Sequence, residues 1–96
     1  MKAYLTDAYI SFAYLWLAAL LGEERLSDLV RLLYVHLGAN PSEETMLGAP
    51  ANVAAFHLER EFGLPKELQF AALQFPHWLE HCGGERLARL TSRWVA

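Results

Sequence analysis

The chain has 96 residues, of which 54% are hydrophobic and 20% charged, and it contains one cysteine. This length supports a single domain, residues 1–96, and the hydrophobic content excludes intrinsic disorder. The formal net charge of −3 gives no positive excess for holding a phosphate backbone, which argues against non-specific nucleic-acid binding. Cys82 cannot form an internal disulfide, so we expect a cytoplasmic protein.

The first predicted element is a helix that starts near residue 3 or residue 7 and ends at Leu21, before Gly22. Its segment Ala8–Leu21 (AYISFAYLWLAALL) is the most apolar part of the chain. Fourteen helical residues reach roughly 21 Å, short of the ~30 Å hydrocarbon core, so we expect no membrane span. The polar seam is narrow and consists of Asp7, Ser11, Tyr14 and Ala18. A helix that is apolar on most sides is either central in a bundle or shared with a partner.

Glycine and proline divide the rest of the chain into further helix-sized pieces. The expected pieces are Glu23–Leu37, Pro41–Leu47, Pro50–Phe62, Pro65–Phe75, the turns His77–Cys82, and Glu85–Trp94. Because Pro76 disfavours the helical conformation at Phe75, we expect a break there. No window has the alternating pattern of a strand. The sequence therefore predicts an all-α fold, a compact bundle of five to six short helices with a largely apolar N-terminal helix.

Two successive predicted helices carry apolar residues outside their main stripe. Val53 and Phe56 fall outside the stripe of the helix Pro50–Phe62, and Phe70 and Leu73 project from the other side of the next helix. A small bundle has little interior in which to bury this surplus. The sequence therefore predicts a non-enzymatic interaction or oligomerisation module. It would bind itself, as a homodimer, or another protein through apolar helical surfaces that include these four residues.

Arg86, Arg89 and Arg93 form a one-sided basic stripe on the last predicted helix. Such a stripe offers contacts to phosphates or to an acidic partner. An ordinary solvated helix face explains the same pattern, since Glu85 and Arg89 are spaced for an ion pair. An RNA- or DNA-associated regulator is therefore an alternative function, which the acidic chain does not favour.

The segment Arg31–His36 (RLLYVH) resembles the R-x4-H spacing of small helical RNases of the HEPN type. The resemblance implies that His36 would act as general acid or base and Arg31 would stabilise the charged phosphate. Residues five apart on a regular helix diverge by about 140°, so the two side chains converge only if the helix ends or kinks between them. The expectation is that the protein is not an enzyme.

His77 and His81 are one helical turn apart, next to Cys82, and the letters His77–His81 (HWLEH) fit the H-x-x-E-H pattern of inverted zincins. Those enzymes need a third ligand far downstream and a larger scaffold. Structural zinc normally takes four ligands at recognisable spacings, which this sequence does not contain. We therefore expect two histidines at the end of a short amphipathic turn, with no metal site and no cofactor. A metal site that His77, His81 and Cys82 form across a dimer interface is the alternative left open.

Overall fold

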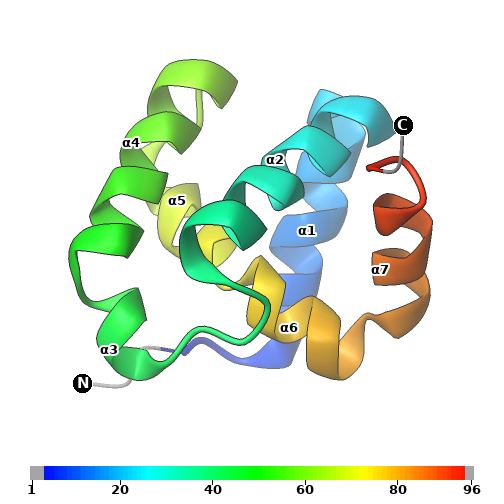
Figure 1. Ribbon diagram of the computed structural model, residues 1–96. Coiled ribbons are helices and arrows are strands. Elements are labelled where there is room, and N and C mark those ends of the chain that lie inside the picture. Colours follow the sequence, from blue (N-terminus) through cyan, green and yellow to red (C-terminus); the bar gives the residue numbers. More distant parts are fainter. Residues whose placement is uncertain (1–3, 95–96) are drawn as a thin grey trace.

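The computed structural model describes residues 4–94, and within this range the chain forms seven α-helices and no strand (Figure 1). They are α1 (Asp7–Leu21), α2 (Glu23–Leu37), α3 (Glu43–Met46), α4 (Ala49–Phe62), α5 (Lys66–Leu73), α6 (Phe75–Cys82) and α7 (Gly84–Thr91). The predicted all-α compact bundle is confirmed. The helix count is higher than predicted because α6 is a helix of its own rather than a turn. α4 and α7 lie at opposite edges of the bundle, with α1 and α2 between them (Figure 1).

Single residues set the ends of the first two helices. The Thr6 hydroxyl accepts a hydrogen bond from the backbone N–H of Tyr9 at 3.3 Å, which caps the start of α1. Gly22 alone separates α1 from α2, and its φ of +83° belongs to a region that favours glycine. As a result α2 folds back against α1, and the two helices share a core.

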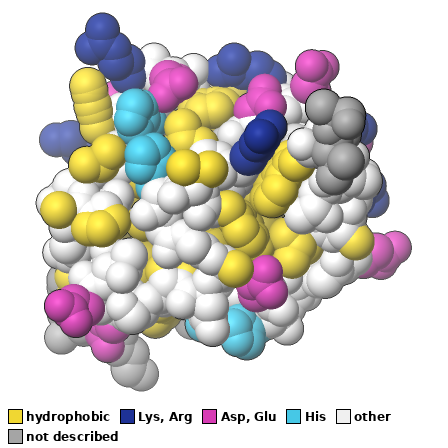
Figure 2. Space-filling model, in the orientation of Figure 1, with side chains coloured by type: hydrophobic (Ala, Val, Ile, Leu, Met, Phe, Trp, Pro, Cys, Tyr) yellow, Lys and Arg dark blue, Asp and Glu magenta, His cyan; other side chains and the backbone are white. Residues whose placement is uncertain are grey.

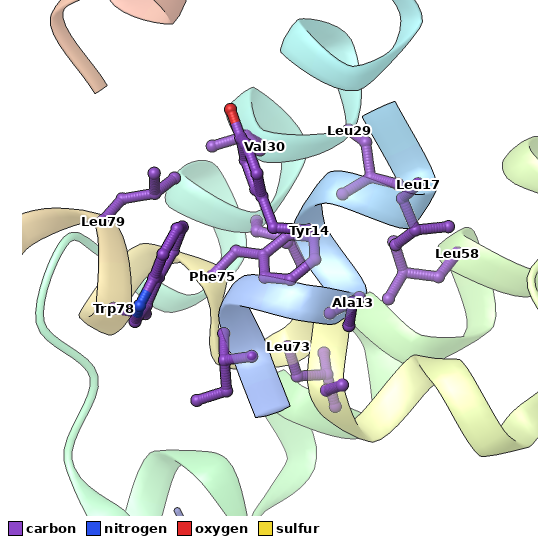
Figure 3. Close-up of a cluster of buried hydrophobic side chains, with 14 of the residues drawn as sticks. Ala13, Tyr14, Leu17, Leu29, Val30, Leu58, Leu73, Phe75, Trp78 and Leu79 are labelled. Atoms are coloured by element: carbon purple, nitrogen blue, oxygen red, sulfur yellow. The ribbon is translucent and has the colours of Figure 1, made fainter. Parts of the chain in front are cut away.

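The core gathers around α2, which packs against α1, α4 and α6. Its buried stripe is the one that the periodicity predicts: Leu26, Leu29, Val30, Leu33 and Leu37. Figure 3 shows Tyr14 of α1 beside Phe75 and Trp78 of α6 at the centre of this cluster, and both ring pairs have centroids 5.3 Å apart. Tyr14 is only 4% exposed, so the polar seam predicted for the first helix does not face solvent at this position.

The break predicted near Pro76 occurs one residue before Phe75. Gln74 ends α5 and precedes α6, and Pro76 lies in the first turn of α6, where a missing N–H costs nothing. The backbone N–H of Gln74 bonds to Ala71 O at 3.1 Å instead of continuing the helical ladder. Its fully buried side chain donates to Phe70 O at 3.1 Å and accepts from the backbone N–H of Leu5 at 2.5 Å.

Replacing Gln74 by leucine is expected to lower the free energy of unfolding by about 1–3 kcal/mol, because the partly buried Phe70 carbonyl and Leu5 N–H lose their hydrogen-bond partner. Urea unfolding followed by circular dichroism measures the change. Gln69→Leu is the matched control, because Gln69 makes one bond, to Leu64 O at 2.8 Å, and we expect a smaller loss. Equal stability of Gln74→Leu and the unmodified protein would contradict the stabilising role of the two Gln74 hydrogen bonds.

α7 attaches to the bundle through its C-terminal end. Leu90 is buried, and the Ser27 hydroxyl of α2 donates to Leu90 O at 3.3 Å. The Trp94 indole N–H donates to the same hydroxyl at 2.9 Å. The helix ends at Thr91, and residues 92–94 form a turn, so the helix predicted up to Trp94 is shorter than expected. Among the described residues, no helix combines the length and apolarity that crossing a bilayer requires.

Candidate interaction surface

One side of α1 turns large apolar side chains toward solvent. These residues, which we call the α1 apolar face, are Tyr9 (48% exposed), Phe12 (69%), Leu15 (52%), Trp16 (45%) and Leu20 (61%). The opposite side of the helix, Ile10, Ala13, Tyr14 and Leu17, is buried against the bundle. α1 is therefore buried on one side only, the side that α2, α5 and α6 cover.

The α1 apolar face has the size of the largest apolar patch on a typical monomeric protein. Large apolar and aromatic side chains carry about 150–250 Å² each, so five that are roughly half exposed present on the order of 500 Å². The largest apolar patch on a typical monomer covers about 300–600 Å² and is often functional. The exposed alanines Ala8 and Ala19 extend the face at its two ends. This area makes α1 the strongest candidate for a binding surface.

The α1 apolar face carries no charge of its own, because no charged residue occurs between Asp7 and Glu23. A shallow groove between α1 and α7 borders it, with Leu15 and Ala19 on one side and Arg86 and Arg89 on the other. The face is thus an uncharged strip whose charged neighbours lie at its rim. This is the distribution of an apolar interface centre with a polar border.

The sequence analysis named four other apolar residues as contact residues, and these residues differ in how far the structure exposes them to solvent. Val53 and Phe56 on α4 are 46% and 48% exposed, as expected for side chains outside the α4 stripe. Phe70 is partly buried, and Leu73 is only 5% exposed. The expectation that Leu73 projects from the core was wrong, because α5 packs against α4, α1 and α6 and so has more than one covered side.

The arginine stripe is engaged within the protein. Arg89 and Arg93 lie 3.5 Å and 3.4 Å from the two carboxylate oxygens of Glu23 at the start of α2. The Arg86 guanidinium lies over the rings of Trp78 and Tyr14, at 5.4 Å and 5.9 Å from their centroids. These contacts reduce the positive charge that the stripe offers to an anionic ligand.

The structure places Arg31 and His36 in one unbroken helix, α2, and so does not supply the kink that would bring them together. Arg31 is exposed. The His36 ring stacks instead on His57 of α4, with centroids 5.1 Å apart, and His57 Nδ1 lies 2.6 Å from a Glu61 carboxylate oxygen. Figure 2 shows two adjoining histidine side chains on the visible face of the molecule, among hydrophobic and charged neighbours.

His77 and His81 lie side by side on α6, with ring centroids 4.4 Å apart. Each Nδ1 has its own oxygen partner: Asn40 Oδ1 for His77 and the His77 carbonyl for His81, both at 2.8 Å. Burial lowers the pKa of His77, and the neighbouring His81 lowers it further. Within residues 4–94, no three His, Cys, Asp or Glu side chains are arranged to hold a metal ion.

The Cys82 thiol donates a hydrogen bond to Asp7 Oδ2 at 3.3 Å. This hydrogen bond raises the pKa of Cys82 above its ordinary value, because ionisation would bring a thiolate against a carboxylate. Near neutral pH the reactive thiolate is therefore scarce, and we expect iodoacetamide to alkylate Cys82 more slowly than a free cysteine peptide. Asp7→Asn should speed alkylation, as followed by mass spectrometry; an unchanged rate would contradict the role of Asp7.

Comparison with known protein families, curated proteins and solved structures finds no match to this chain. The candidate site therefore depends on the geometry alone. Sequence reasoning left the apolar first helix either central in a bundle or shared with a partner, and it assigned the contact residues to two later helices. The missed signal is the spacing of Phe12, Trp16 and Leu20, which lie one turn apart along α1 and outside its buried stripe.

Proposed function

We propose that the protein is a non-enzymatic protein–protein interaction module and that the α1 apolar face is its contact surface. The observation that carries this proposal is the exposure of five large apolar side chains on one side of a single helix. Leaving such a face in water is unfavourable, by about 25 cal/mol for each Å² of apolar surface. A partner that covers the face recovers this free energy. We propose the cytoplasm as the compartment, in keeping with the single unpaired cysteine.

The nucleic-acid alternative has less support. The cations of Arg86, Arg89 and Arg93 are held by two aromatic rings and Glu23, and the chain is acidic as a whole. The RNase hypothesis needs Arg31 and His36 to converge on one phosphate, whereas His36 packs against His57. Filter binding of labelled RNA to the protein and to Arg86→Ala tests this alternative. Binding that depends on Arg86 would revive it.

Photo-crosslinking tests the proposed contact surface. A benzophenone amino acid placed at Phe12 should give a discrete adduct in cells. The same group at Val35 should not, because Val35 is a 76% exposed apolar residue on α2 and serves as a matched control. The adduct should disappear when Trp16→Glu is added to the same chain, since a charge on the face opposes apolar contact. No adduct at Phe12 beyond the Val35 control would overturn the proposal.

A further inference from the structure

The α1 apolar face has a composition suited to pairing with itself. Its central side chains, Phe12 and Trp16, are one helical turn apart, and Tyr9 and Leu20 lie toward its two ends. With no charged side chain on the face, two copies can meet without like-charge repulsion at the centre. A two-fold dimer uses the same patch on both subunits, so the patch must be complementary to itself. An uncharged apolar face meets this requirement.

The area also suits a second copy. Two faces of on the order of 500 Å² would bury roughly 1,000 Å² of apolar surface, and stable interfaces bury about 1,200–2,000 Å² in total. The flanking residues of the α1–α7 groove and the exposed alanines Ala8 and Ala19 supply the remaining area at the border. A single α1 face therefore comes close to the size that a stable dimer needs.

The helix ends favour one orientation. Glu23 and Glu24 lie just beyond Gly22, at the negative C-terminal end of α1, and Glu23 is paired with Arg89 and Arg93 whereas Glu24 is exposed. Parallel packing would bring these acids close to their copies and would align the two helix dipoles. Antiparallel packing instead sets the two helix dipoles in opposite directions and places each acidic end beside the first turn of the other α1, where Asp7 accepts a hydrogen bond from Cys82. It also sets Phe12 of each copy opposite Trp16 of the other, giving two equivalent aromatic contacts.

On these grounds we propose that the partner of the α1 apolar face is α1 of a second copy of this chain, packed antiparallel about a two-fold axis that crosses the interface at the height of residues 14 and 15. This inference rests on the proposed function and deepens it by naming the partner. In this arrangement Tyr9 of one copy lies opposite Leu20 of the other. Ala8 and Ala19 meet on the other flank, where small side chains let the helices approach closely.

Disulfide pairing between chains tests the orientation. Both chains carry Cys82→Ser, which removes the native thiol and keeps a hydrogen-bond donor for Asp7. A chain with Tyr9→Cys is then mixed with a chain with Leu20→Cys under mild oxidation. Antiparallel packing predicts a disulfide between the two chains, identified by mass spectrometry of the linked peptides. Mixing Tyr9→Cys with Ala8→Cys should give none, because antiparallel packing separates these positions by about eleven residues of helix, or roughly 16 Å.

Light scattering supplies the second measurement. We expect a dimer whose dissociation constant rises at least about a hundredfold in Phe12→Glu, since each interface then buries two unpaired charges. Val35→Glu should leave the dissociation constant unchanged. A disulfide between Tyr9→Cys and Ala8→Cys chains, or a dimer that Phe12→Glu does not weaken, would overturn the inference.

A monomer at every concentration would also overturn the second copy as partner, but it would leave the proposed function standing. In that case the photo-crosslinked adduct at Phe12 would have the mass of this chain plus a different protein. Loss of both the dimer and the adduct would overturn the inference and the proposed function together. The two experiments thus separate the failure of one from the failure of the other.

Discussion

Replacing Trp78 by alanine is expected to lower the free energy of unfolding by about 3–5 kcal/mol, a large share of the 5–15 kcal/mol typical of a domain. Trp78 is 2% exposed, its ring centroid lies 5.3 Å from that of Tyr14, and the Arg86 guanidinium lies over it. The substitution removes these contacts and leaves a cavity between α1 and α6 (Figure 3). Urea unfolding at 25 °C, followed by far-UV circular dichroism, measures the loss.

Trp16→Ala is the matched control for this prediction, because it removes the same side chain from the α1 apolar face. Trp16 is 45% exposed, so we expect its removal to cost about 1 kcal/mol or less at a protein concentration low enough to keep the chain monomeric. Equal losses for the two variants would contradict the division of α1 into a core side and an exposed side.

Local sequence signals predicted most of the fold. Gly22, Gly38 and Gly63 end helices at the predicted positions, and each has a positive φ. The α2 stripe faces the core as its periodicity indicates, because its remaining positions are mostly polar and leave one choice of buried side. Where one face is polar and the other apolar, the sequence identifies the buried side without knowledge of the neighbours.

Helices with two apolar faces were harder to predict. Leu73 and Phe12 both lie on apolar helices, yet Leu73 is 5% exposed and Phe12 is 69% exposed. Periodicity states which residues share a face, but the packing of neighbouring helices decides which face is covered. α5 is enclosed by α1, α4 and α6, whereas among residues 4–94 no helix covers the side of α1 that carries Phe12. This difference depends on the tertiary arrangement and is absent from any local pattern.

The charged candidates depended on long-range contacts in the same way. The spacing of Arg86, Arg89 and Arg93 predicted a one-sided stripe, and the structure confirms that Arg89 and Arg93 share a side. Their ion partner, Glu23, is more than sixty positions away in the sequence and is brought close by the docking of α7 on α2. Only the fold determines how much of the stripe's charge remains for an external ligand.

The melting temperature is expected to rise by about 7 °C when the protein concentration increases by about a hundredfold. Self-association through the α1 apolar face stabilises the folded state by mass action, by about 2.7 kcal/mol per dimer over this range. Unfolding of a chain of 96 residues has an entropy of about 0.2 kcal/mol/K, or about 0.4 kcal/mol/K for the dimer, which converts this free energy into the stated shift. Differential scanning calorimetry at several concentrations measures it.

Phe12→Glu should abolish this concentration dependence and keep the melting temperature that the unmodified protein has once it is diluted enough to be monomeric, because Phe12 is 69% exposed and contributes little to the core of the monomer. Val35→Glu, on an exposed position of α2, should keep the full dependence. A concentration-independent melting temperature in the unmodified protein would show that folding is not linked to self-association. A Phe12→Glu variant that melts far below the dilute protein would instead show that this side of α1 supports the fold itself.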